Sequence, residues 1–249
     1  MNYRPQGFTL LPPIIKNLLI INGLMFMGTI VLKDALGFNF VEMFALYYPG
    51  SPNFMPHQLI THMFMHADFG HIFFNMFALW MFGTALENIW GPKKFLIYYM
   101  VTGLGAAFIH LGVNYLEMQW MHSQLLEGGF TAADITNLLA NGSWSDDVTV
   151  SRDIIERYYG NYNFPTLGAS GAVFGILLAF GMTFPEQRIY IYFLLPIKAK
   201  WFVIIYGAFE LWNGVMNTSD GVAHFAHLGG MIFGYFLIKH WQKNQFRQW

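Results

Sequence analysis

The sequence predicts an all-α membrane protein, a single domain over residues 1–249 with six transmembrane helices and a helical extramembrane insertion between the third and fourth. Of the 249 residues, 55% are hydrophobic and only 11% are charged, whereas about 25% of the residues of an average soluble domain are charged. Six apolar stretches approach the roughly 20 residues that a helix needs to cross a bilayer. They lie at 14–32, 71–90, 95–115, 168–184, 201–216 and 222–238.

The first stretch contains Asn22 and is not followed by a small-residue cleavage site, so it predicts a membrane anchor rather than a signal peptide. The second and third stretches are close to a full crossing length. The fourth and fifth are shorter and carry polar residues. Because no internal repeat or low-complexity tract interrupts these stretches, we expect them to form one membrane domain.

The segment between the third and fourth stretches, residues 116–165, is acidic on balance and too long for a plain connector. Thr131 with Asp134 predicts the start of a short helix, and the Asn-Gly pair at 141–142 predicts its end. A second short helix is expected over 151–160, where a serine precedes it and a glycine closes it. We therefore expect a small helical insertion outside the membrane.

The basic residues predict the orientation of the chain, because cytoplasmic loops carry an excess of lysine and arginine. Ten basic residues fall on the side of the two termini and three on the other side, which is also the side of the insertion. Both termini are therefore expected in the cytoplasm, with the bacterial inner membrane as the simplest location. The ten are Arg4, Lys16, Lys93, Lys94, Arg188, Lys198, Lys200, Lys239, Lys243 and Arg247; the three are Lys33, Arg152 and Arg157.

Several classes of partner are excluded by composition. The chain has no cysteine, so neither disulfides nor thiolate metal sites are possible. No basic block suggests binding to nucleic acid, and the net charge of -1 says little about partners. Membrane lipids are the surroundings that the apolar stretches predict.

Polar residues of three stretches fall at one depth of the membrane. At about 1.5 Å per helical residue, Ser170, Asn75 and His227 lie roughly 9 to 13 Å below the outer edge of a core about 30 Å thick. His71 and Asn75 are four residues apart and share a helix face. A serine, an amide and two histidines are therefore expected in one layer.

Two glycine pairs predict which helices meet in that layer. Gly171 and Gly175 form one pair of small residues four positions apart, and Gly230 and Gly234 form another; such pairs let helix backbones approach closely. His227 shares the face of the second pair. If the two glycine faces touch, the histidine comes within hydrogen-bond reach of the serine at 170.

This arrangement would support nucleophilic catalysis. The Ser170 hydroxyl needs an adjacent base to take its proton, and a neutral His227 imidazole can serve, since its usual pKa lies near the working pH. No acidic residue sits at this depth on the second, fourth or sixth stretch, so a Ser/His dyad is expected. His71, Asn75 and the Ser170 backbone N–H are suitable oxyanion donors, and Gly168 would let the chain pass close to a substrate backbone.

Three motifs resemble those of rhomboid intramembrane serine proteases. "GASGAVFG" at 168–175, "HMFMHADFGHIFFNM" at 62–76 and "AHLGGMIFG" at 226–234 are similar to the GxSG, HxxxN and AHxxGxxxG motifs of that family. The resemblance covers all six stretches in order and implies a rhomboid-like bundle. It also implies that Ser170 is the nucleophile and His227 the base, with oxyanion donors from His71 and Asn75. Family members cleave transmembrane proteins near the outer membrane face without a metal or cofactor.

Two positions depart from the family pattern. A tryptophan and an arginine often precede the second helix in the family, and this chain has His57 and Gln58 in that loop. Many members have a tyrosine four residues after the serine, stacked on the catalytic histidine, and this chain has Phe174. A phenyl ring can stack in the same way but lacks the hydroxyl.

Two other functions remain open at this stage. A histidine-ligated membrane metalloenzyme is possible because five histidines could converge on a metal; they are His62, His66, His71, His224 and His227. The second alternative is a catalytically inactive rhomboid-like protein that binds membrane clients. Such relatives usually lack the serine or the histidine. Glu210 in the fifth stretch is a functional candidate as an intramembrane carboxylate, but it is as compatible with an interfacial position.

Overall fold

The computed structural model describes residues 7–145, 147–191, 194–216 and 223–245. The predicted start of the sixth stretch at Val222, and the basic residues Arg4 and Arg247, lie outside these ranges. The described elements are α1 Pro13–Leu36, α2 Phe40–Phe44, α3 Gln58–Thr61, the 3-10 turn η1 His62–Phe64, α4 Phe69–Trp90, α5 Pro92–Glu127, α6 Ala132–Asn141, α7 Arg152–Asn163, α8 Ser170–Thr183, β1 Arg188–Ile191, β2 Leu195–Lys198, α9 Ala199–Met216 and α10 His224–Gln245.

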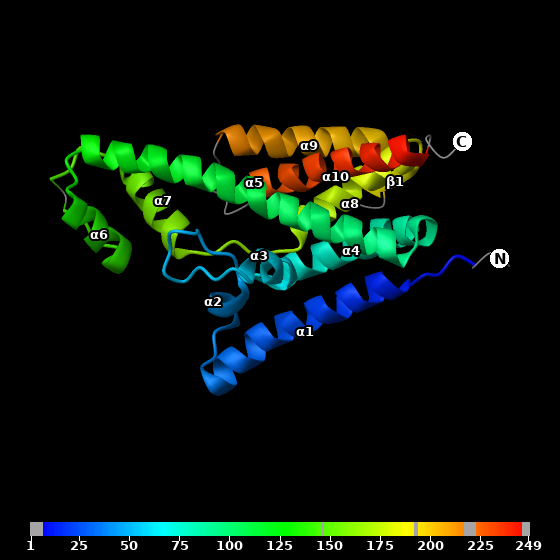
Figure 1. The fold of residues 1–249 in the computed structure, drawn as a ribbon, viewed down its shortest axis with the longest axis horizontal. Helices are drawn as coiled ribbons and strands as arrows, with labels where there is room; N and C mark the ends of the chain where they lie inside the picture. The colour runs from blue at the N-terminus through cyan, green and yellow to red at the C-terminus, as the bar shows by residue number, and fades with distance from the viewer. Residues whose placement is uncertain (1–6, 146, 192–193, 217–222, 246–249) are drawn as a thin grey trace.

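The membrane-type helices gather around α8. Helices α4, α5, α9 and α10 all contact α8, and α1 packs against α4 on the outside of this group. The first turn of α1 and the last turn of α10 lie at the same end of the molecule, whereas α6 and α7 lie at the opposite end (Figure 1). Ten of the 14 residues of α8 are buried, so this helix forms the centre of the bundle.

Three described helices are long and apolar enough to cross a membrane, at Pro13–Leu32, Phe69–Trp90 and Pro92–Glu127. The chain is thus a helical membrane protein, as expected. Helix α8 is apolar but has only 14 residues, or about 21 Å, which is short of a core about 30 Å thick. Helices α9 and α10 carry more polar residues. The count of six crossings therefore stays a prediction.

Helix α5 is longer than the sequence predicted. It continues from Pro92 to Glu127 without a break, so the first part of the expected insertion, residues 116–127, is an extension of the third stretch. Pro92 at its first turn follows Gly91, whose φ of 78° ends α4, and proline is well suited to the first helical position because it needs no N–H partner there. At about 1.5 Å per residue, α5 is about 54 Å long.

The predicted ends of α6 are confirmed in detail. The Thr131 side chain accepts from the Asp134 N–H, and the Asp134 carboxylate accepts from the Thr131 N–H, which together form a capping box. Gly142 closes the helix in the left-handed conformation with φ 66°. Helix α7 starts after Ser151 as expected, but it passes Gly160 and ends at Asn163.

The insertion has a hydrophobic core of its own. Large side chains from the end of α5 meet the apolar faces of α6 and α7 there, and they are Met118, Met121, Leu125, Phe130, Ile135, Leu138, Ile155 and Tyr158. The capping box of α6 and the amphipathic faces of α6 and α7 are typical of helices in soluble proteins. This part of the chain is therefore built like a small soluble bundle on the end of α5.

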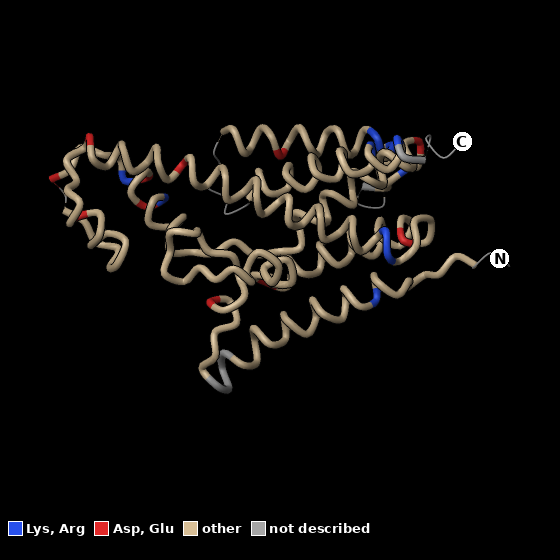
Figure 2. Tube along the Cα trace, viewed as in Figure 1, with Lys and Arg blue, Asp and Glu red and all other residues tan. Residues whose placement is uncertain are grey.

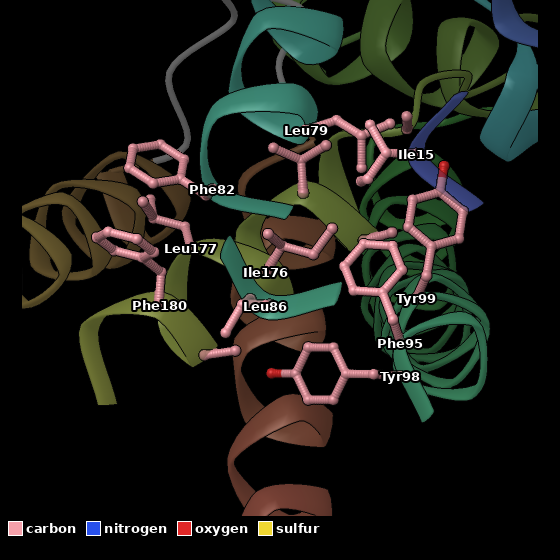
Figure 3. Packing of buried hydrophobic residues seen from close by; sticks show 14 of the residues in the cluster. Ile15, Leu79, Phe82, Leu86, Phe95, Tyr98, Tyr99, Ile176, Leu177 and Phe180 are labelled. Carbon is pink, nitrogen blue, oxygen red and sulfur yellow. The ribbon is translucent and has the colours of Figure 1, made fainter. Parts of the chain in front are cut away.

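The bundle core around α8 combines large rings with very small contact residues. Leu79 and Phe82 of α4, Phe95 and Tyr99 of α5, and Ile176 of α8 fill the space between helices (Figure 3). The glycines of α8 and α10 are found instead where backbones approach. A Cβ placed on Gly175 would lie 2.6 Å from the Thr102 side chain of α5.

The segment between α8 and α9 forms a short antiparallel ribbon that the sequence analysis did not predict. Strand β1 pairs with β2 in a register that sets Arg188 opposite Lys198. Glu186 forms ion pairs with Lys198 at 2.7 Å and with Lys200, and these two partners hold the pKa of this carboxyl down to about 2. Most of the described lysines and arginines lie at this end of the molecule (Figure 2).

Candidate active site

A cavity of about 760 Å³ opens between α4, α5, α8, α9 and α10. Its lining contains all four polar residues that the sequence placed in one layer, namely His71, Asn75, Ser170 and His227. Glu210 and His224 are among the other polar residues that line the same cavity. Residues from five separate helices therefore face one cavity, and concave pockets of this kind are where ligands and substrates usually bind.

Ser170 is the first residue of α8, and the backbone before it is tightly held. Gly168 has a φ of +134° and donates its N–H to the His62 carbonyl at 3.0 Å. A Cβ at Gly168 would lie 2.8 Å from His71 Nε2, so only glycine fits between the histidine ring and the start of α8. The Ser170 N–H lies in the first turn of the helix, where backbone donors have no partner within the helix.

His227 is oriented by Phe174, the residue one turn after Ser170. The two rings are stacked with centroids 4.1 Å apart and an interplanar angle of 7°. Since residues i and i+4 share a helix face, the serine and the stacked histidine lie on the same side of α8. Stacking therefore occurs at Phe174 without the hydroxyl that many family members carry.

Helices α8 and α10 approach each other at the glycines that the sequence singled out. A Cβ at Gly230 would overlap the Gly171 carbonyl oxygen, and one at Gly234 would overlap the Tyr98 hydroxyl of α5. Gly171 itself faces Ala106 of α5. The Ser170 hydroxyl nevertheless makes no hydrogen bond with any described residue, so the serine and His227 share the cavity without a direct bond. Catalytic hydrogen bonds are often long in structures without substrate.

His71 presents a defined nitrogen to the start of α8. Its Nδ1 accepts the Ala67 N–H at 3.4 Å, so a neutral ring must carry its hydrogen on Nε2, the atom that lies against Gly168. The Asp68 side chain caps α4 by accepting from the His71 N–H at 2.9 Å. Asn75 donates one amide hydrogen to the His71 carbonyl at 3.0 Å and keeps a second for the cavity.

Glu210 of α9 is the residue that the sequence analysis did not place in the site. Its Oε2 atom lies 2.9 Å from His227 Nδ1 and 2.7 Å from His224 Nδ1, and only 3% of Glu210 is exposed. We expected a dyad because no acidic residue lies on the second, fourth or sixth stretch, but the carboxylate comes from the fifth. The spacing of three residues between His224 and His227, which puts both on one face of α10, was the signal for a shared partner.

The same three side chains could coordinate a metal ion. One ligand atom each from Glu210, His224 and His227 lies within 4.8 Å of the others, and in the described part of the chain this is the one group of its kind. The five histidines do not converge. His62 Nδ1 instead donates to the Gln58 carbonyl at 2.8 Å, and the His66 ring stands edge-on to His71 with centroids 5.0 Å apart.

A family model of the rhomboid domain matches residues 53–241, which include α4, α5, α8, α9 and most of α10. The chain belongs to the rhomboid family. This confirms the resemblance read from the three motifs.

Curated rhomboids align at moderate identity. RHOMBOID-like protein 12, mitochondrial, of Arabidopsis thaliana is 28% identical over 194 residues, which are 77% of this chain and 48% of that protein. Rhomboid protein 1, mitochondrial, of Saccharomyces cerevisiae is 26% identical over 77% of this chain and 44% of that protein. Rhomboid protease GluP of Bacillus subtilis is 27% identical over 72% of this chain and 25% of that protein. This rhomboid thus spans less than half the length of these relatives.

The names of these relatives correct the predicted location. The expectation of a bacterial inner membrane is wrong by this comparison, since the plant and yeast proteins and a rat relative are all named as mitochondrial. Counts of basic residues carry information about orientation in a membrane, not about which membrane it is.

The first loop of this rhomboid is anchored without the tryptophan and arginine that are frequent in the family. Gln58 is fully buried; its Oε1 accepts the Met55 N–H at 3.0 Å, and its Nε2 donates to the Asn53 carbonyl at 3.0 Å. His57 Nε2 donates to the Met43 carbonyl at 2.8 Å. Gln58 and His57, which stand in the loop where the family often has a tryptophan and an arginine, therefore hold this loop by hydrogen bonds.

Proposed function

We propose that this rhomboid is an intramembrane serine endopeptidase that cleaves transmembrane protein substrates near the outer membrane face. The proposal rests mainly on one observation, that a single cavity is lined by Ser170, His227, His71 and Asn75. Membership of the rhomboid family supports the reaction class, and so does the relative from Bacillus subtilis, which is named a rhomboid protease. The names of the other relatives favour a mitochondrial membrane as the location.

In the proposed mechanism, Ser170 Oγ attacks the scissile carbonyl carbon while its proton passes to His227 Nε2. The carbonyl oxygen becomes an oxyanion, which accepts hydrogen bonds from the Ser170 N–H, His71 Nε2–H and Asn75 Nδ2–H. The C–N bond then breaks as His227 gives its proton to the leaving amine. Water attacks the acyl-enzyme with His227 again as base, which releases the acid and restores Ser170.

Labelling with a fluorophosphonate probe tests this proposal without knowledge of the substrate. The probe modifies activated serine hydroxyls, so we expect labelling of the wild type, none of Ser170→Ala and strongly slowed labelling of His227→Ala. Ser123→Ala is a matched control, because Ser123 Oγ only donates to the Trp120 carbonyl of its own helix, and it should label like the wild type. Undiminished labelling of Ser170→Ala would overturn the proposal, as would cleavage of a model transmembrane substrate by that variant.

We also propose that α1, α4, α5, α8, α9 and α10 all cross the membrane. The common end reached by the start of α1 and the end of α10 supports an even number of crossings (Figure 1). Because the chain has no native cysteine, single cysteines can be introduced one at a time and labelled with a membrane-impermeant maleimide. Residues 145 and 187 should label from opposite sides, and labelling of both from one side would contradict six crossings.

A metalloenzyme is the second candidate function, and the cluster of Glu210, His224 and His227 is the observation that favours it. Carboxylate and imidazole ligands suit zinc or iron. Metal analysis of purified protein separates the two functions. Stoichiometric zinc or iron whose removal by a chelator abolishes turnover would favour the metalloenzyme, whereas turnover that survives chelation would favour the serine protease.

A further inference from the structure

We infer that Glu210 is a positioning residue for His227, so that the catalytic group of this rhomboid is a Ser-His-Glu triad and not a dyad. This inference rests on the proposed function and deepens it. Helix α9 supplies the third member, whereas α8 supplies the serine and α10 the histidine. The three residues line one cavity, and the bond between Glu210 Oε2 and His227 Nδ1 is 2.9 Å long.

The first argument concerns which nitrogen of His227 carries hydrogen. An ionised carboxylate can only accept hydrogen bonds, so the contact with Glu210 requires a hydrogen on His227 Nδ1. A neutral ring with hydrogen on Nδ1 has its lone pair on Nε2. That is the nitrogen that must accept the Ser170 proton, so Glu210 selects the reactive tautomer.

The second argument concerns charge. When the Ser170 proton moves to Nε2, His227 becomes a cation in a site where 8% of its surface is exposed. Water is then a poor source of stabilisation, and a carboxylate in hydrogen-bond contact with the ring stabilises the charge as it forms. Among the residues that the structure describes, no lysine or arginine pairs with Glu210, and the carboxylate contacts His224 and His227 instead.

The third argument concerns what holds Glu210 in place. His224 Nδ1 donates to the same Oε2 atom at 2.7 Å, so the buried carboxylate has a second partner that does not take part in proton transfer. Tyr206, one turn before Glu210 on α9, packs on Phe174 with ring centroids 4.9 Å apart. Phe174 in turn stacks on His227. Helix α9 therefore fixes the His227 ring both at its edge and through its stacking partner.

The test compares Glu210→Gln with a matched change at Glu87. Glu87 is also a buried carboxylate that accepts two N–H groups, from Ile14 and Ile15, each at 2.9 Å, but it lies outside the cavity. The glutamine at 210 keeps the size of the side chain and removes the charge. We expect Glu210→Gln to lower kcat at least about tenfold with little change in KM, and Glu87→Gln to keep the wild-type kcat at temperatures where it is folded.

Two further readouts separate positioning from a general structural effect. Glu210→Asp retains the carboxylate and should recover part of the kcat that Glu210→Gln loses. In ¹⁵N NMR of histidine-labelled protein, with the His227 signal assigned by its absence from His227→Ala, the wild-type ring should carry hydrogen on Nδ1 and the Glu210→Ala ring should lose this preference.

The outcomes distinguish the inference from the function on which it rests. An inactive Ser170→Ala variant together with wild-type kcat for folded Glu210→Gln would overturn the triad and leave the serine protease intact. Hydrogen on Nε2 of wild-type His227 would also overturn the triad. Turnover by Ser170→Ala would instead remove the proposed function itself.

Discussion

Leu138 in the insertion and Gly230 in the bundle are both buried, yet opposite kinds of substitution should disrupt them. Leu138 fills the space between α5, α6 and α7 with a large side chain, and its removal would leave a cavity. Gly230 leaves room for the Gly171 carbonyl, and any side chain there would push two helices apart. Large apolar side chains hold α5, α6 and α7 together around Leu138, whereas α8 and α10 are held by a close contact of their backbones at Gly230.

This difference is the one expected for an insertion that lies in water and a helix bundle that lies in lipid. In water, burial of large apolar side chains is the main stabilising contribution. In lipid, the solvent is as apolar as leucine, so helix association depends on packing and on hydrogen bonds between helices. The Tyr98 hydroxyl, which donates to the Gly175 carbonyl at 2.8 Å, is an example of such a bond. The candidate site lies in the region where packing tolerates the least change.

The largest effect is expected from Gly230→Val. The new side chain would meet the Gly171 backbone, which cannot move without shifting Ser170, so turnover should be abolished and the protein destabilised by about 3 kcal/mol or more. Gly112→Val is the matched control, because a Cβ at Gly112 meets nothing within 4 Å. Cleavage of a model substrate and thermal unfolding measure both effects. Active Gly230→Val would show that α8 and α10 need no backbone contact.

A smaller effect is expected from acid, through the loop that supports Ser170. Burial lowers the pKa of His62 to about 4, whereas an unfolded histidine takes up a proton near pH 6.5. Between pH 6.5 and pH 4 the unfolded state therefore binds more protons than the folded state. The free energy of unfolding should fall by about 3 kcal/mol over this range because of His62. The His62 carbonyl accepts from Gly168, so turnover should fall with it.

His62→Gln sharpens this prediction because glutamine does not titrate. Thermal unfolding followed between pH 7 and pH 4 should show a shallower loss of stability in the variant than in the wild type. Part of the acid sensitivity should remain, since burial also lowers the pKa of His66 to about 4. Equal slopes for the variant and the wild type would mean that His62 is not buried as a neutral ring.

The smallest effect on turnover is expected from Leu138→Ala. The cavity that it leaves should destabilise the insertion by about 2 to 5 kcal/mol, measured by hydrogen exchange of α6 and α7. The cleavage rate should stay within about a factor of two of the wild type, because no residue of this core lines the cavity of the site. A loss of turnover as large as that of Gly230→Val would show that the two regions unfold together.

The parts that the sequence predicted well are those with local signals. The capping box of Thr131 and Asp134 and the closing Gly142 depend on neighbours within a few residues, and so do the helix faces that bear Ser170 and His227. Glu210 is different. Its contact with His227 depends on how α9 packs against α10. The residues near Glu210 in the sequence, such as Tyr206 four positions before it, do not indicate this packing.

Two other features depended on context in the same way. The ribbon formed by 188–191 and 195–198 is too short to show a strand pattern, and Gln58 replaces the family's loop anchor with a different side chain. The extension of α5 over 116–127 was missed because its polar residues resembled a connector, although they lie on the outward side of a helix whose Met118, Met121 and Leu125 face inward.

The unbroken course of α5 has a mechanical consequence. An uninterrupted helix transmits bending along its length. This one carries α6 and α7 at one end, and nearer the other end its Thr102 and Ala106 pack against the glycines of α8. A molecule that pulls on α6 and α7 would thus tilt the surface of α5 against which α8 packs. Leverage of this kind needs neither a hinge nor a moving loop.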